Sequence, residues 1–116
     1  MKHPTIRSLR EQDFIDLYGE APTVSVRGYA AELDGECIGI AGVSMKYPAE
    51  AFSLLDPRMK AFPRAIVEAV RLYRQLLSTI TVPVYALADQ DEPSAPIFLR
   101  HVGFEQLDEV AYKWPS

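Results

Sequence analysis

The sequence Phe98-Leu99-Arg100-His101-Val102-Gly103-Phe104 predicts a helix that ends at a glycine and continues directly into a strand. A glycine such as Gly103 ends many helices because it adopts the left-handed conformation without steric cost. Residues 104–114, which close with Tyr112-Lys113-Trp114, are expected to form the last strand. We therefore predict a helix over 94–102, preceded by an acidic turn, and a strand after it.

The strongest helical pattern lies earlier in the chain, over residues 62–77. Its apolar positions have the spacing i, i+4, i+7 and i+11, which places them on one continuous helix face. These positions are Ile66, Val70, Tyr73 and Leu77. Pro63 suits the first turn of this helix, because the missing N–H has no intrahelical partner there.

The rest of the chain alternates between short strands and one short helix. Asp34-Gly35 is a hairpin signal, and Gly19 is expected to end the first helix. The predicted strands are 5–9, 23–33, 37–47, 51–55 and 82–88, and the first helix is 11–18. The resulting order, β-α-β-β-β-α-β-α-β, indicates a single α/β (α+β) domain over residues 1–116.

Composition excludes several classes of protein. The chain has 116 residues, 48% of them apolar, and a net charge of −4, so a general nucleic-acid binder is not expected. No apolar run is long enough for a membrane helix, and the N-terminus lacks the apolar core of a signal peptide. Cys37 is the only cysteine, which excludes an internal disulfide, leaves almost no material for a metal site and fits a cytoplasmic location.

The element order, the segment 98–104 and the closing Tyr112-Lys113-Trp114 together resemble the GNAT N-acetyltransferase superfamily. The segment is similar to the fourth helix of that family and its Gly-Phe ending, and the Asp34-Gly35 hairpin is similar to its second and third strands. The resemblance implies a central mixed, mostly antiparallel sheet flanked by about three helices. It also implies acetyl-CoA as cofactor and an amine as acceptor.

The cofactor's pyrophosphate in this family lies at a glycine-rich loop that opens the long helix, where backbone N–H groups bind the anion. Residues 58–64 match this loop only in part: Arg58 is kept, whereas Ala61 and Pro63 replace glycines, and Pro63 has no N–H. A cluster of cations could compensate. The residues expected at the cofactor are Leu55, Arg58, Lys60, Ala61, Phe62 and Arg64. The alternative is a solvated basic helix start.

Catalytic residues are harder to assign. Leu99 stands where the family often has a tyrosine that protonates the departing thiolate. Glu50, just before the predicted strand 51–55, is the candidate base, and a solvated loop acid is its alternative. The resemblance implies that the backbone near Ser53 to Leu55 binds the thioester carbonyl. Three further side chains, Tyr47, Tyr85 and Tyr112, could reach a cleft or serve only as half-buried aromatics.

Two functions remain open from the sequence. The first is an N-acetyltransferase that acts on a small amine or a protein. The second is a catalytically inactive interaction protein on the same fold, of phage origin and associated with a virion. The segment 20–22 is too short for a helix covering the acceptor, so that side is either an open substrate site or a surface for a homodimer. A nucleic-acid module would rest only on the arginines and Lys60 of residues 58–74.

Overall fold

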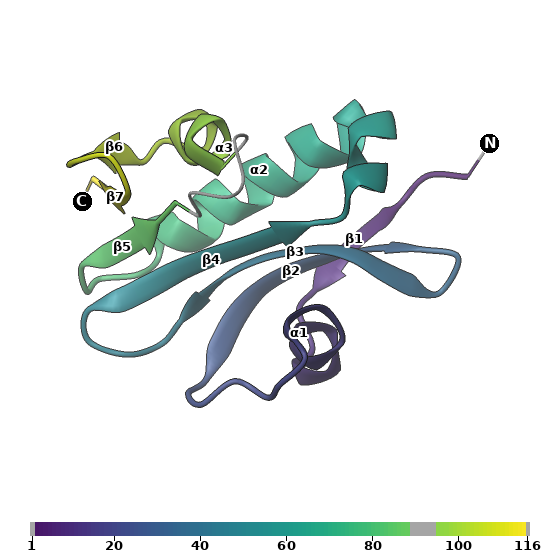
Figure 1. Ribbon diagram of the computed structural model, residues 1–116, viewed down its shortest axis with the longest axis horizontal. Helices are drawn as coiled ribbons and strands as arrows, with labels where there is room; N and C mark the ends of the chain where they lie inside the picture. Colours follow the sequence, from purple (N-terminus) through teal and green to yellow (C-terminus); the bar gives the residue numbers. More distant parts are fainter. Residues whose placement is uncertain (1, 89–94, 116) are drawn as a thin grey trace.

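The computed structural model describes residues 2–88 and 95–115, which form one seven-stranded sheet with helices on both faces (Figure 1). The strand order is β1-β2-β3-β4-β5-β7-β6. The strands are β1 Thr5–Ser8, β2 Val26–Leu33, β3 Glu36–Ser44, β4 Ala49–Leu55, β5 Val84–Leu87, β6 Glu105–Gln106 and β7 Ala111–Lys113. Among the strands of the described residues, β4 and β5 form the one parallel pair. The predicted mixed, mostly antiparallel sheet is confirmed.

In residues 2–88 and 95–115, three α-helices cover the sheet, as predicted. Helix α1, Glu11–Tyr18, lies on one face, and α2, Pro63–Ser78, and α3, Ala95–Val102, lie on the other (Figure 1). A short 3₁₀ helix, η1 Pro57–Ala61, precedes α2. None of the helices in the described part of the chain has the length and apolar character that a membrane span needs.

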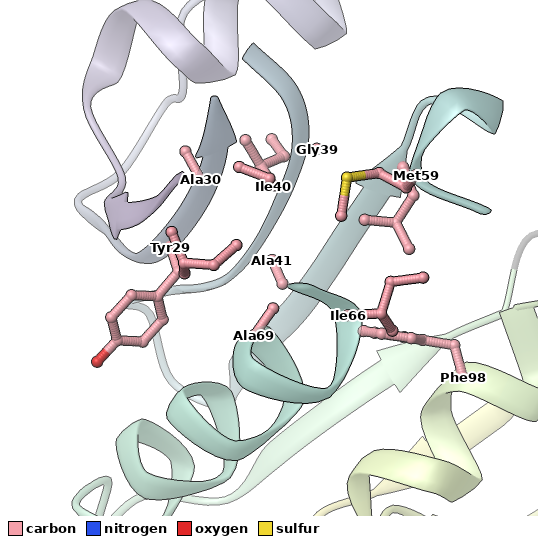
Figure 2. A pocket seen from close by; sticks show the side chains of 12 residues that line it. Tyr29, Ala30, Gly39, Ile40, Ala41, Met59, Ile66, Ala69 and Phe98 are labelled. Atoms are coloured by element: carbon pink, nitrogen blue, oxygen red, sulfur yellow. The ribbon is translucent and has the colours of Figure 1, made fainter. Parts of the chain in front are cut away.

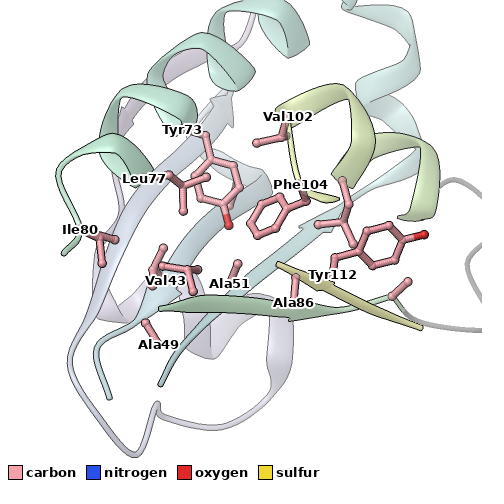
Figure 3. Packing of buried hydrophobic residues seen from close by; sticks show 14 residues of the cluster. Val43, Ala49, Ala51, Tyr73, Leu77, Ile80, Ala86, Val102, Phe104 and Tyr112 are labelled. Atoms are coloured by element: carbon pink, nitrogen blue, oxygen red, sulfur yellow. The ribbon is translucent and has the colours of Figure 1, made fainter. Parts of the chain in front are cut away.

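The main core lies between the sheet and the pair α2 and α3 (Figure 3). Tyr73 and Leu77, from the predicted apolar face of α2, are 1% and 0% exposed. They pack against residues of β3, β4, β5, α3 and β7. Members of this cluster from those elements are Val43, Ala51, Val84, Val102 and Tyr112. The helical periodicity of the sequence therefore identified the face that faces the core.

Local turn signals are also confirmed. Asp34 and Gly35 have φ values of 53° and 81° and connect the register pair Leu33 and Glu36, which is the geometry of a two-residue hairpin loop. Gly19 ends α1 at φ 84° and Gly103 follows α3 at φ 122°. At Gly19 and Gly103, a residue with a Cβ would be strained.

Two of the predicted strands are corrected by the structure. β4 begins at Ala49, so Glu50 lies inside the strand rather than before it. The single last strand over 104–114 is wrong: it is a hairpin of β6 and β7. The Asp108 carboxylate accepts hydrogen bonds from the N–H groups of Val110 and Ala111 at 2.9 and 2.8 Å, and this turn folds the segment back. The predicted acidic turn 91–93 and the first residue of the helix predicted from 94 lie outside the described residues.

Candidate active site

Strand β4 separates from β5 halfway along its length. Parallel pairing runs from Ala49 opposite Val84 to Ala51 opposite Ala86, whereas pairing with β3 continues to Leu55. The Asp56 N–H donates to the Ile38 carbonyl at 2.9 Å. Because antiparallel bonds alternate along a strand, this bond makes the backbone groups of Ser53 and Leu55 point away from β3. They face the side from which β5 has diverged.

The start of η1 carries an ion-pair cluster of Glu36, Asp56 and Arg58. The Asp56 carboxylate accepts the Arg58 N–H at 2.9 Å and the Arg58 Nε at 3.1 Å. The Arg58 guanidinium also donates to Glu36 from Nη1 at 3.2 Å and from Nη2. These hydrogen bonds lower the pKa values of both carboxyl groups. The positive charge of Arg58 is therefore balanced by the carboxylates of Glu36 and Asp56.

The helix start also has few backbone donors left for an anion. Pro63, the first residue of α2, lacks an N–H, and the N–H groups of Ala65 and Ile66 both donate to the Phe62 carbonyl, at 3.1 and 3.2 Å. Among the first four residues of α2, the Arg64 N–H is therefore the one left to bind an anion. The start of α2 is thus a turn whose backbone donors are largely used internally.

The remaining residues predicted at the cofactor divide into two groups. Lys60, Ala61 and Arg64 are exposed around the start of α2. Phe62 is half-buried, packs against the cluster containing Met59 and Ala65, and its ring centroid lies 6.4 Å from that of His3. Its aromatic ring therefore contributes to the packing of the fold.

Leu55, at the end of β4, borders a small apolar hollow of about 20 Å³ between the sheet, α2 and α3 (Figure 2). Met59, Ile66 and Phe98 line the same hollow. A Cβ on Gly39 would lie 2.9 Å from a Leu55 methyl carbon, so this glycine allows Leu55 to approach β3. The hollow lies beside the unpaired end of β4.

Glu50 lies beside an aromatic cluster on the α1 side of the sheet. Phe52 follows it on the same face of β4, since strand side chains alternate. The Phe52 ring lies 5.4 Å from Phe14 and 6.1 Å from Tyr18, centroid to centroid. Burial and the negative charge of Glu50 raise the pKa of Tyr18. Glu50 itself is half-exposed and pairs with Lys46 at 2.9 Å.

The structure thus places Glu50 within β4, on the opposite face from Leu55. Leu55 shares the sheet face of Ala51, under α2, and Glu50 faces α1 on the other side. Tyr18 and Phe52, the neighbours of Glu50, were not singled out by sequence reasoning. Had the predicted strand begun at Ala49, its alternation would have placed Phe52 on the same face as Glu50.

The tyrosines offer no obvious proton donor. Leu99, in the position where the family often has a tyrosine, is buried in the main core. Tyr47 is 79% exposed in the β3–β4 loop. The Lys113 Nζ lies over the Tyr85 ring, 5.9 Å from its centroid. Tyr112 is fully buried, and its hydroxyl has no hydrogen-bond partner within residues 2–88 and 95–115.

Comparison with known proteins identifies the fold. No protein-family model matches the chain, and no curated protein matches its sequence. Solved structures match over nearly the whole chain, and the following three are among the most similar.

The acetyltransferase from Agrobacterium tumefaciens C58 has a TM-score of 0.59 at 15% identity, over 98% of this chain and 91% of that one. YhhK from E. coli, a proposed N-acetyl transferase bound to coenzyme A, has a TM-score of 0.58 at 14% identity, over 97% and 98%. A chimera of the spermidine N-acetyltransferase SpeG from Vibrio cholerae with hSSAT has a TM-score of 0.58 at 17% identity, over 96% and 92%. The divergence of β4 from β5, the order of the elements and these likenesses agree: the chain has the fold of the GNAT N-acetyltransferases.

Proposed function

We propose that the protein is an acetyl-CoA-dependent N-acetyltransferase. The observation that carries this proposal is the divergence of β4 from β5, which leaves the backbone groups of Ser53 and Leu55 facing an unpaired side. Support comes from the fold, because the solved neighbours are acetyltransferases and one of them is bound to coenzyme A.

The chemistry follows from the position of β4. A thioester carbonyl lying along the strand accepts a hydrogen bond from a β4 N–H, which stabilises the oxyanion that forms when an amine attacks. The amine nitrogen bonds to the carbonyl carbon, the C–S bond breaks, and coenzyme A leaves as a thiolate. With Leu99 unable to donate a proton, the thiolate takes its proton from water. Alignment of the two reactants supplies a large share of the rate.

Glu50 is the proposed base. Its carboxylate lies on the α1 face, beside Tyr18 and Phe52, so the amine approaches β4 from that face and loses its proton to Glu50 directly or through water. Lys46 forms an ion pair with this carboxylate in the free protein. This ion pair must open when the acceptor binds. Because the segment between α1 and β2 contains no helix, the acceptor side is open to a small amine such as spermidine, the substrate named for SpeG, or to a protein amine.

Lys60 and Arg64 are the proposed phosphate contacts at the helix start, together with Arg58. Lys60 and Arg64 form no ion pair within the described ranges 2–88 and 95–115. To bind a phosphate, Arg58 would have to break an ion pair with Glu36 or Asp56. Ala61 and Phe62 complete the loop, and Leu55 lies against the pantetheine.

The test is calorimetric titration with acetyl-CoA, followed by a thiol-release assay with spermidine as acceptor. We expect micromolar binding, and a Glu50→Gln variant that keeps this binding but loses more than about tenfold in kcat. Glu109→Gln, which neutralises an exposed acid between β6 and β7, away from the proposed site, is the matched control. Absence of both heat and thermal stabilisation at millimolar acetyl-CoA, together with a stable dimer in sedimentation, would instead support a non-catalytic interaction protein.

A further inference from the structure

Lys46 is the lysine that lies against the proposed base. It belongs to the exposed loop between β3 and β4, at the end of the sheet where β5 begins (Figure 1). Its Nζ lies 2.9 Å from Oε2 of Glu50, and both side chains are about half exposed. An amine of the chain itself therefore occupies the place that the acceptor amine is proposed to take.

This ion pair lies close to the point where β4 and β5 diverge. The last parallel pair is Ala51 opposite Ala86, and Ala51 is the residue after Glu50. A chain-like cofactor that enters the gap from its open end has its terminal thioester nearest to this closed end. Ser53, whose backbone groups face the gap, is about 7 Å beyond Ala51 along β4. The flexible four-carbon stem of Lys46 can carry Nζ from the carboxylate towards a thioester in this position.

The side chain of Lys46 can leave the carboxylate at little cost. An exposed ion pair between two long side chains contributes little to stability, because water solvates both charges. The backbone of the loop, in contrast, is held in place. The Met45 N–H donates to the Ser25 carbonyl at 2.7 Å, and the Lys46 N–H donates to the Ser44 carbonyl at 3.0 Å. The loop thus keeps Lys46 beside the site while its side chain is free to move.

The other three lysines of the chain are less well placed. Lys2 lies in an ion pair at the β2–β3 hairpin, and Lys60 lies in η1, beyond the far end of β4. Lys113 shares the sheet face of Glu50, since Tyr85 is the register partner of both residues. It lies two strands away, which corresponds to about 10 Å. Lys113 is therefore the natural internal reference for the reactivity of Lys46.

We infer that Lys46 is a site of self-acetylation, to which the protein transfers an acetyl group from acetyl-CoA within one chain. Glu50 takes one proton from the Lys46 ammonium, and the lone pair of Nζ then attacks the thioester carbonyl carbon. The C–S bond breaks and an amide forms. The nitrogen releases a second proton to water, and the departing thiolate takes one proton from water. This inference rests on the proposed function, because acetyl-CoA is the donor.

Acetylation of Lys46 changes the proposed site in a defined way. The acetylated side chain carries no positive charge, so it no longer forms the ion pair with Glu50. The carboxylate is then available to an external amine. The first acetyl group transferred therefore prepares the site for later acceptors.

The test incubates the full chain with acetyl-CoA, without an added amine, and follows each lysine by peptide mass spectrometry. We expect Lys46 to be acetylated at least about tenfold faster than Lys113, at a rate that does not depend on protein concentration. Lys113→Arg, the matched control, should keep the acetylation of Lys46, whereas Glu50→Gln should slow it to the rate of Lys113. Circular dichroism melting confirms that the variants are folded.

The outcomes separate the inference from the proposed function. Acetylation of Lys46 no faster than that of Lys113 overturns the inference, as does a rate that rises with protein concentration. Turnover of spermidine by a protein whose Lys46 stays unmodified also overturns it and leaves the proposed function intact. If acetyl-CoA neither binds in calorimetry nor modifies any lysine, both are overturned.

Two substitutions of Lys46 test the effect on the base. Lys46→Gln mimics the acetylated side chain, and Lys46→Arg keeps the positive charge but accepts no acetyl group. With spermidine as acceptor, we expect Lys46→Gln to react about threefold faster than Lys46→Arg, the factor that corresponds to an exposed ion pair. Equal rates would overturn the role assigned to the ion pair.

Discussion

Two buried tyrosines differ in what their hydroxyl groups contact. The Tyr73 hydroxyl donates to the Gly42 carbonyl at 2.7 Å and lies 3.4 Å from the Phe52 carbonyl. Burial raises the pKa of Tyr73, so its proton stays in place to tie α2 to β3 and β4. The Tyr112 hydroxyl is buried without a partner among the described residues.

Replacing each tyrosine by phenylalanine should therefore have opposite consequences. Tyr73→Phe loses a buried hydrogen bond and is expected to lower the free energy of unfolding by about 1 kcal/mol. Tyr112→Phe removes an unpartnered hydroxyl and should leave stability unchanged or raise it. Urea unfolding of both variants measures the difference, and equal losses would contradict this account.

Asp13 is a buried carboxylate held by arginine. It is 3% exposed and accepts bonds from Arg7 Nη1 at 2.7 Å, Arg7 Nη2 at 2.8 Å and the Arg10 N–H at 2.8 Å. The bonds to Arg7 lower the pKa of Asp13 below its usual value of 3.8, against the opposing effect of burial. The pair connects α1 to β1.

The lowered pKa sets the direction of a pH dependence. Stability from Asp13 is complete above pH 3.8 and declines as the pH falls below 3.8 through the folded-state pKa. Asp13→Asn should cost about 3 kcal/mol at pH 7 and should reduce the loss of stability on acidification. Urea unfolding between pH 7 and strongly acidic pH tests this, with exposed Asp16→Asn as control. An unchanged acid profile in Asp13→Asn would reject the assignment.

At the scale of elements, β2 and β3 approach each other unusually closely. Gly28 and Gly42 are register partners, and a Cβ built on Gly42 would lie 2.4 Å from the Arg27 carbonyl oxygen and 2.7 Å from a Phe52 ring carbon. The first of these atoms belongs to the backbone, so it cannot move without shifting β2. The glycines are thus required by the packing of the strands against each other.

Gly42→Ala should therefore destabilise the sheet by about 2–3 kcal/mol through overpacking. Ser44→Ala, two residues further along β3, is the control and is expected to change stability by no more than about 0.5 kcal/mol. Thermal unfolding of the two variants gives the comparison. If Gly42→Ala melted with the wild type, the close approach of the strands would not exist in solution.

At the scale of the whole molecule, the end of the chain completes the sheet and the core. β7 lies between β5 and β6, and its Tyr112 is fully buried in the main cluster. Residues near the C-terminus therefore pack against elements formed by the middle of the chain, and we expect the sheet to unfold as a single cooperative unit.

Removing residues 105–116 should abolish cooperative unfolding, because β5 loses an antiparallel neighbour and the core loses Tyr112 and the partly buried Trp114. Near-ultraviolet circular dichroism during heating measures the loss. The full-length Tyr112→Phe variant, which keeps the ring, is the control. A truncated chain with a sharp transition close to that of the full chain would show that the two strands are dispensable.

The sequence by itself determined the order of the elements as far as α3, the buried face of α2, the Asp34-Gly35 turn and the glycine that ends α1. Each of these depends on short-range sterics and on side-chain periodicity, which are properties of neighbouring residues.

Only the tertiary structure decided which distant residues meet. It paired Arg58 with Glu36, placed Glu50 beside Tyr18, and connected the Tyr73 hydroxyl to Gly42. These contacts link segments far apart in the chain, and their geometry depends on how the sheet twists and how the helices pack on it. Local patterns carry no record of that packing, so the charge balance at the helix start and the surroundings of Glu50 emerge only in the folded molecule.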